Sequence, residues 1–166
     1  MIKKSIKYID LFCGMGGFRI GIEDALKDLG LKGECVFSCD NKKSAVTTYI
    51  NNFTDSKVHG DITKIKEDQV PSFDVLLGGF PCQAFSSAGK KEGFNDTRGT
   101  LFFDILRLIK YSLPDCFILE NVEGLVKHDI KNKNDSIGHT LTVIINNLKK
   151  TGYYVHYKIL DTKDFG

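Results

Sequence analysis

The chain has 166 residues, of which 42% are hydrophobic and 27% are charged, and its formal net charge is +2. This length and composition indicate one folded domain and exclude an intrinsically disordered chain. The net charge is too small to predict a nucleic-acid partner by itself.

Strand and helix patterns alternate along the chain. Short apolar runs rich in β-forming residues predict strands, and apolar residues spaced i, i+3, i+4, i+7 predict amphipathic helices. In chain order, the predicted elements are a strand at 6–12, a helix at 22–29, a strand at 35–38, a helix at 45–53, strands at 57–59 and 73–77, a helix at 101–111, a strand at 116–119, a helix at 141–148 and a strand at 153–160. This alternation indicates an α/β fold, with a doubly wound, mostly parallel sheet and helices on both faces. The carboxyl ends of its parallel strands then share one edge, where such folds bind ligands.

The five cysteines suggest neither disulfides nor a metal site. Their number is odd and no C-x-x-C pair occurs, so neither a disulfide framework nor a zinc site is predicted. We therefore expect a reducing, intracellular compartment and no resident metal. The N-terminus lacks the apolar core of a signal peptide, and no apolar run is long enough to span a bilayer. No membrane partner is expected.

A glycine-rich turn after the first predicted strand is the first candidate site. Residues 10–17 read DLFCGMGG; glycines let the backbone approach a ligand closely, and a helix N-terminus offers it free amides. The spacing G-x-G-G does not meet the dinucleotide fingerprint, which argues against a nicotinamide dehydrogenase. Asp40 follows the second predicted strand at an offset of about 20 residues, from which a carboxylate can reach a ribose hydroxyl pair. With Asp61 after the third strand, these features predict an adenosine-type ligand without a pyrophosphate.

A cysteine after the fourth predicted strand is the second candidate site. Residues 78–83 read GGFPCQ, so a glycine pair bends the backbone and Cys82 is presented at the carboxyl end of the strand. Glu120 ends the fifth apolar strand, which brings a nucleophile and a general acid to the same edge. The alternatives are a packed small cysteine for Cys82 and a cap of the following turn for Glu120.

The loop at residues 83–99 is the third candidate site. It is rich in Gly, Ser and Lys, is basic at Lys90, Lys91 and Arg98, and carries an aromatic residue. Hydroxyl, basic and aromatic side chains are suited to close over a phosphate backbone and insert into a base stack. The alternative is an ordinary flexible surface loop.

These motifs together resemble the cytosine-C5 DNA methyltransferase family, in particular its bacterial restriction-modification enzymes. The stretches that carry the resemblance are DLFCGMGGF at 10–18, GDI at 60–62, GFPCQ at 79–83, RGTLF at 98–102 and ENV at 120–122. The resemblance extends from about Ile9 to the last residue. It implies a Rossmann-like fold, S-adenosylmethionine as methyl donor, no metal, and double-stranded DNA as partner.

The resemblance also implies roles for individual residues. Cys82 would attack C6 of a flipped-out cytosine and turn C5 into an enamine carbon. Glu120 would bind or protonate N3 of the base, and Pro81 and Asn121 would shape its pocket. The residues implied around the cofactor are Phe12, Gly14, Met15, Gly16, Gly17, Asp40, Asn41, Asp61, Ile62 and Leu101. The residues implied to contact DNA are Gln83, Ser86, Ser87, Lys90, Lys91 and Arg98.

The chain departs from the family pattern in two places. Asn41 stands where many members carry an aromatic residue that stacks on adenine, and Asp40 replaces the commoner glutamate, so we expect modest cofactor affinity. The chain also stops before the family's arginine-containing motif and target-recognition domain. We therefore expect residues 1–166 to be an incomplete catalytic domain, a fragment or a split subunit with a C-terminal companion, with little activity alone. A tRNA-cytosine methyltransferase and a non-catalytic adenosine-binding module are the alternatives.

Overall fold

The structure is a computed structural model and describes residues 5–81, 101–130 and 135–165. The chain forms two compact units. The described part of the first comprises residues 5–81 and 101–120, and that of the second comprises residues 121–130 and 135–165. The predicted sites at the strand ends fall mainly in the first unit.

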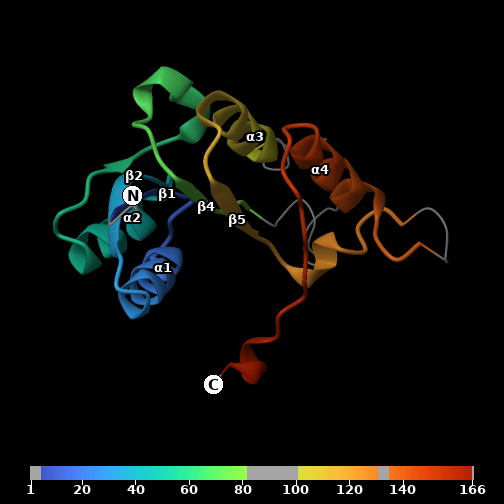
Figure 1. Ribbon diagram of the computed structural model, residues 1–166, viewed down its shortest axis with the longest axis horizontal. Coiled ribbons are helices and arrows are strands. Elements are labelled where there is room, and N and C mark those ends of the chain that lie inside the picture. The colour runs from blue at the N-terminus through green and yellow to red at the C-terminus, as the bar shows by residue number, and fades with distance from the viewer. Residues whose placement is uncertain (1–4, 82–100, 131–134, 166) are drawn as a thin grey trace. The chain divides into compact units, whose positions relative to one another are not determined.

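A parallel sheet is the centre of the first unit (Figure 1). Its strands, in chain order, are β1 (Ser5–Leu11), β2 (Lys32–Cys39), β3 (Val58–His59), β4 (Val75–Gly79) and β5 (Cys116–Glu120). They lie in the order β3-β2-β1-β4-β5, and every pair is parallel. The direction of winding reverses between β1 and β4, and such a switch point opens a crevice at the carboxyl ends of the strands.

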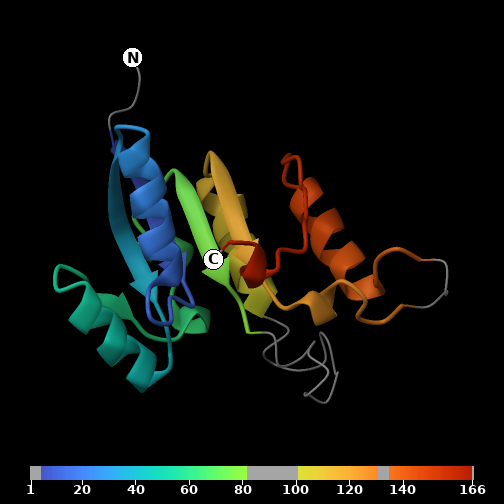
Figure 2. The same cartoon turned by 90° about the horizontal axis from the view of Figure 1, so that it is seen from below.

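Helices cover both faces of this sheet, as the alternating pattern predicts. The helices of the unit are α1 (Gly17–Asp28), α2 (Lys43–Asn52) and α3 (Leu101–Ser112). Phe18 and Ile22 of α1 pack against Tyr8 and Leu77 on one face. Ile105 of α3 lies beside Gly78. Because successive residues of a strand face opposite sides, Gly78 and Leu77 lie on opposite faces of the sheet, so α3 covers the face opposite to α1. Figure 2 shows α1 and α3 on opposite sides of the strands.

The core is built from residues at the expected periodicities. Along α3, the buried positions repeat with helical spacing, and they are Phe102, Ile105, Leu106, Leu108 and Ile109. In the centre of the sheet, Leu76 and Leu77 are both fully buried because helices lie on both faces of β4. Burial of each such side chain contributes about 2 kcal/mol to folding.

The second unit contains one α-helix among its described residues, α4 (His139–Lys149). Two short 3-10 turns accompany it, at Glu123–Leu125 and Thr162–Asp164. The buried imidazole of His128 pairs its Nδ1 with Thr140 Oγ1 at 2.8 Å, which ties the segment before α4 to the helix. Gly138 packs so closely on the His128 backbone that a Cβ there would overlap it.

The strand predicted at residues 153–160 is wrong. These residues form no strand in the structure, and most of their side chains are exposed. The local pattern of β-branched and aromatic residues there is typical of a strand, but a strand exists only where a neighbouring strand accepts its backbone hydrogen bonds.

Within the described ranges, no helix combines the length and apolar character needed to cross a bilayer.

Candidate active site

The sequence-predicted site residues of the first unit gather at the carboxyl edge of the sheet. The glycine turn follows β1, Asp40 follows β2, and Asp61 follows β3. Pro81 comes two residues after β4, and Glu120 is the last residue of β5. Because all strands are parallel, these five strand ends share one edge, as predicted.

The glycine turn adopts a shape that side chains would obstruct. Gly14 has φ +53° and Gly16 has φ +94°, in the left-handed region that favours glycine. Phe12 also has a positive φ, 56°, which is uncommon for a bulky residue and marks local strain. The Gly16 amide donates to the Cys13 carbonyl at 2.8 Å and closes the turn.

The amino terminus of α1 has no side-chain cap among the described residues. Gly16 is the N-cap residue and has no side chain to accept from the first helical amides. Such amides carry the positive end of the helix dipole. The turn before them leaves Met15 exposed. A close backbone approach combined with uncapped amides is the arrangement in which proteins hold polar parts of nucleotide-like ligands.

Asp40 supports this turn directly. Its Oδ2 accepts a hydrogen bond from the Gly14 amide at 3.0 Å, and its Oδ1 accepts from the Lys42 amide at 2.8 Å. A carboxylate oxygen has two acceptor positions, so each oxygen retains one for a ligand. Asn41, between Asp40 and Lys42 in the chain, is exposed. The sequence predicts a ligand contact for Asp40 but not this structural contact with the turn.

Asp61 and Ile62 form a second turn at the same edge. Asp61 Oδ1 accepts from the amide and the hydroxyl of Thr63, at 3.0 Å and 2.8 Å, and begins a 3-10 turn at Ile62–Lys64. These hydrogen bonds hold the pKa of Asp61 below its usual value. Arg107 of α3 donates to the carbonyl of buried Ile62 at 2.6 Å. Leu101, at the start of α3, is half-buried.

Glu120 lies beside Gly79 across the β4–β5 pair. The two residues are in register, and Glu120 Oε2 is 3.2 Å from the position a Cβ at Gly79 would occupy. The Glu120 side chain therefore uses space that glycine leaves free. The sequence predicts a buried strand here, but Ile118 is 51% exposed and Glu120 is exposed. β5 is an edge strand among the described strands, so its α1-side face is only partly covered.

A cavity of about 460 Å³ adjoins Glu120 on the α1 side of the sheet. It is lined by Gly17, Phe18, Gly21, Ile22, Ala25, Leu77, Ile118 and Glu120. Glu120 is the one charged residue of this lining, and Gly17 connects the cavity to the glycine turn. Asp40 and Asp61 do not line it, so the cavity and the acidic strand ends are separate parts of the edge.

A buried acid next to the turn is the feature that sequence reasoning missed. Asp10, in β1, is fully buried, and burial raises the pKa of its carboxyl to about 7. Its Oδ2 accepts from the Tyr49 hydroxyl at 3.3 Å, while Oδ1 has no hydrogen-bond partner among the described residues. The signal in the sequence is a charged residue inside an apolar strand. Cys13 and Cys39 are also buried, and burial raises the pKa of both thiols.

Several predicted residues lie outside the described residues. They are Cys82 and the loop residues Gln83, Ser86, Ser87, Lys90, Lys91 and Arg98. The juxtaposition of Cys82 and Glu120 therefore stays a prediction. Asn121 belongs to the second unit, where its Oδ1 accepts from the Val122 amide at 3.0 Å. In the part of the chain that the structure describes, no cluster of three His, Cys, Asp or Glu side chains could hold a metal ion.

Sequence comparisons agree with the motif analysis. A family model described as C-5 cytosine-specific DNA methylase matches residues 6–166. The chain is 53% identical over 163 residues to the type II methyltransferase M.NgoBV of Neisseria gonorrhoeae, covering 98% of this chain and 38% of that protein. It is 49% identical over 166 residues to M1.ScrFI of Lactococcus lactis subsp. cremoris, covering 99% of this chain and 39% of that protein. The chain thus spans about two fifths of the length of these curated relatives.

Solved structures confirm the fold. The Entamoeba histolytica methyltransferase EhMeth superposes with a TM-score of 0.72 at 21% identity, covering 98% of this chain and 49% of that one. The S. pombe Dnmt2 methyltransferase superposes with a TM-score of 0.60 at 20% identity, covering 88% of this chain and 41% of that one. The first unit therefore has the Rossmann-like parallel sheet of these two structures.

Proposed function

Since this chain belongs to the C-5 cytosine-specific DNA methylase family, we propose that it carries the catalytic part of an enzyme that methylates C5 of cytosine in DNA. The donor would be S-adenosylmethionine, and the cytosine would be flipped out of the duplex. The observation that carries the proposal is the pairing of Gly79 with Glu120 at the edge that also holds the glycine turn. Cys82 follows Gly79 by three residues in the sequence.

The residues of the edge fit the proposed cofactor. The glycine turn permits close approach, and the uncapped N-terminus of α1 can receive polar groups. Asp40 and Asp61, at the next two strand ends, keep acceptor positions for hydroxyl or amino groups. The cofactor set would be completed by Phe12, Gly14, Met15, Gly16, Gly17, Asn41, Ile62 and Leu101. When bound, S-adenosylmethionine supplies an electrophilic methyl group.

The chain's own residues would activate the base. The Cys82 thiolate adds to C6, forming an S–C6 bond and moving the C5–C6 π electrons toward C5. Glu120 holds a proton at N3, which offsets the negative charge that this addition places on the ring. Once C5 is methylated, a base removes the C5 proton, the C5–C6 double bond returns and the thiolate leaves. Pro81 and Asn121 would shape the pocket around the base.

The proposal also covers which residues contact the DNA and which further region of protein the chain needs for activity. Gln83, Ser86, Ser87, Lys90, Lys91 and Arg98 would contact the DNA. Because the chain spans about 38% of M.NgoBV, we propose that base-sequence recognition needs a region supplied by a longer protein or a companion polypeptide, and that the chain alone methylates poorly. A DNA substrate would place the enzyme with bacterial DNA in the cytoplasm, as part of a restriction-modification system.

Covalent trapping tests the proposal. The chain, supplemented with the C-terminal region of a relative such as M.NgoBV, is incubated with S-adenosylmethionine and duplex DNA containing 5-fluorocytosine. Because fluorine at C5 cannot leave as a proton does, we expect a stable adduct at Cys82. The variant Cys82→Ser should give none, whereas the control Cys116→Ser, which changes an exposed cysteine of β5, should give as much as the parent.

Three other outcomes would contradict the proposal in different ways. An adduct with tRNA but not with DNA would favour the RNA-cytosine alternative. Binding of S-adenosylhomocysteine with no adduct on either nucleic acid would favour a non-catalytic adenosine-binding module. Robust methylation of duplex DNA by the 166-residue chain alone would refute the proposed dependence on a further region.

A further inference from the structure

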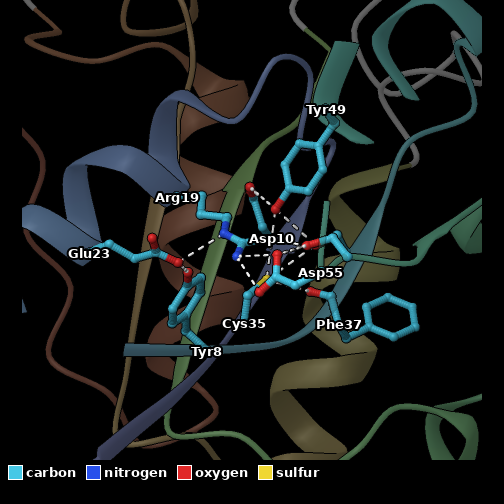
Figure 3. Close-up of polar contacts among 10 residues, drawn as sticks. Tyr8, Asp10, Arg19, Glu23, Cys35, Phe37, Tyr49 and Asp55 are labelled. Atoms are coloured by element: carbon cyan, nitrogen blue, oxygen red, sulfur yellow. Dashed lines mark hydrogen bonds and ion pairs between the residues drawn. The ribbon is translucent and has the colours of Figure 1, made fainter. Parts of the chain in front are cut away.

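Arg19, in the first turn of α1, is a buried cation. Its side chain is 6% exposed, and burying an unpaired guanidinium would be strongly unfavourable. Its Nε donates to Glu23 at 2.9 Å, its Nη2 donates to both Asp55 carboxylate oxygens at 3.1 Å and 3.2 Å, and its Nη1 donates to Ser56 (Figure 3). Burial alone would lower the pKa of Arg19, but its hydrogen bond to Glu23 and the neighbouring groups raise it above its usual value. Arg19 is therefore charged, and each nitrogen of its guanidinium donates a hydrogen bond.

These partners join α1 to the segment that follows α2. Glu23 lies four residues along α1, whereas Asp55 and Ser56 lie between α2 and β3. The guanidinium carbon also lies 4.2 Å from the centroid of the Phe53 ring, close enough for a cation–π interaction. Arg19 thus fixes the position of residues 53–56 against the first turn of α1.

Phe53 passes this constraint on to the glycine turn. A Cβ built at Gly16 would overlap the Phe53 ring, so the ring fills the space beside the turn. One residue earlier, Asn52 Nδ2 donates to the Met15 carbonyl at 3.1 Å. Two consecutive residues at the end of α2 therefore contact two consecutive residues of the turn.

We propose that Arg19 is a positioning residue for cofactor binding: through Phe53, it holds the turn at residues 13–16 in its ligand-ready shape. The inference deepens the proposed function, because it names the group that fixes the turn on which the cofactor would lie. The side chains to which Arg19 donates, Glu23, Asp55 and Ser56, are neither proposed cofactor residues nor proposed catalytic residues. A guanidinium suits this position better than an ammonium, because the three nitrogens of its planar fork bond Glu23, Ser56 and Asp55 separately while its plane stacks on the Phe53 ring.

Hydrogen exchange of the chain without any ligand tests the positioning role. The variants are Arg19→Lys, which keeps the charge but loses the fork, and Phe53→Leu, which removes the ring. In both, we expect amides of residues 13–18 to exchange about tenfold faster, the size expected for loss of a coupling of this kind. The matched control, Glu23→Gln, changes a partner of Arg19 that lies on α1 itself and should alter exchange there less than about twofold.

Exchange at residues 75–79 of β4 separates a local effect from general destabilisation. If exchange at residues 13–18 rises no more than exchange at 75–79, Arg19 is only a structural contact and the inference is wrong. Should Arg19→Lys fail to fold, Asp55→Asn decides the question in its place, because the Asp55 side chain is 74% exposed and tolerates substitution.

Binding of S-adenosylhomocysteine, measured by calorimetry on the folded chain, provides the second readout. We expect its Kd to rise about tenfold in Arg19→Lys and Phe53→Leu and to stay within about twofold in Glu23→Gln. If the parent chain does not bind S-adenosylhomocysteine, the proposed function fails while the exchange result still decides the positioning role. If the parent binds and Arg19→Lys binds equally well, only the inference fails.

Discussion

The main-chain amide of Gly14 donates a hydrogen bond of 3.0 Å to the carboxylate of Asp40, and this contact joins the segments that follow β1 and β2. The same carboxylate accepts from the Lys42 amide through its other oxygen. Asp40 is therefore more than a candidate ligand contact, because it also fixes two main-chain segments at the carboxyl edge of the sheet.

Replacement of Asp40 by alanine should affect both stability and cofactor binding. The substitution leaves the Gly14 and Lys42 amides without their acceptor, which should lower the free energy of unfolding by about 1–3 kcal/mol. It should also weaken S-adenosylhomocysteine binding by about tenfold or more, as the turn loses its support. Urea denaturation and calorimetry measure the two effects. If Asp40→Ala leaves both quantities unchanged, the hydrogen bonds have no energetic role.

Substitution by alanine should lower the free energy of unfolding at Gly16 and raise it at Gly21. At Gly16, alanine would need a φ of +94° and its Cβ would overlap the Phe53 ring, so we expect a loss of about 1–3 kcal/mol of stability. At Gly21, in the interior of α1, a Cβ meets nothing within 4 Å. Alanine there should raise the free energy of unfolding by up to about 1 kcal/mol through helix propensity. Equal effects of Gly16→Ala and Gly21→Ala in urea denaturation would rule out this account of the turn.

The buried carboxyl of Asp10 should make stability depend on pH in an unusual direction. Its pKa is raised from 3.8 to about 7, so between these values the folded chain binds a proton that the unfolded chain has released. The contribution of Asp10 to the free energy of unfolding is therefore greatest at low pH. As the pH rises toward 7, this contribution falls by up to about 4 kcal/mol. Arg19, Tyr49 and Asp40 also act on this pKa, and burial is the largest cause.

The isosteric variant Asp10→Asn tests this assignment. Its amide does not titrate, so the difference in unfolding free energy between variant and parent should grow in favour of the variant from pH 4.5 to pH 7.5. Urea denaturation at three pH values across that range measures it. A difference that is constant with pH would show that Asp10 titrates normally.

Arg107 should stabilise the first unit through α3. It forms ion pairs with Asp104 at 2.9 Å and Glu67 at 3.1 Å, and it donates to the Ile62 carbonyl. Its side chain is 26% exposed, so solvent weakens these contacts only in part. We expect Arg107→Ala to lower the free energy of unfolding by about 1–2 kcal/mol.

The control for Arg107 is the exposed Lys110 in the last turn of the same helix. Lys110→Ala should change stability by less than about 0.5 kcal/mol. Guanidinium denaturation of the two variants and the parent provides the comparison. A loss as large in Lys110→Ala as in Arg107→Ala would point to a general effect of removing positive charge from α3.

Local patterns account for most of the fold that the sequence predicts. The helical repeat of Phe102, Ile105 and Ile109 places one face of α3 in the core, and the apolar run that contains Leu76 and Leu77 forms the central strand. Such patterns are reliable because burial of a contiguous apolar face is decided by spacing along the chain. The failure at residues 153–160 has the complementary reason, because strand pairing depends on a partner distant in sequence.

The sequence by itself determined the family, the order of strands and helices from β1 to α4, and which residues stand at the carboxyl ends of the strands. Only the tertiary structure decided that Asp40 supports the Gly14 turn, that Asp10 is buried with a raised pKa, and that Arg19 joins α1 to the segment after α2. These three roles depend on contacts between residues 26 to 39 positions apart. Motif spacing reports local geometry, whereas burial and pairing of a charge are set by whichever distant segments the folded chain brings around it.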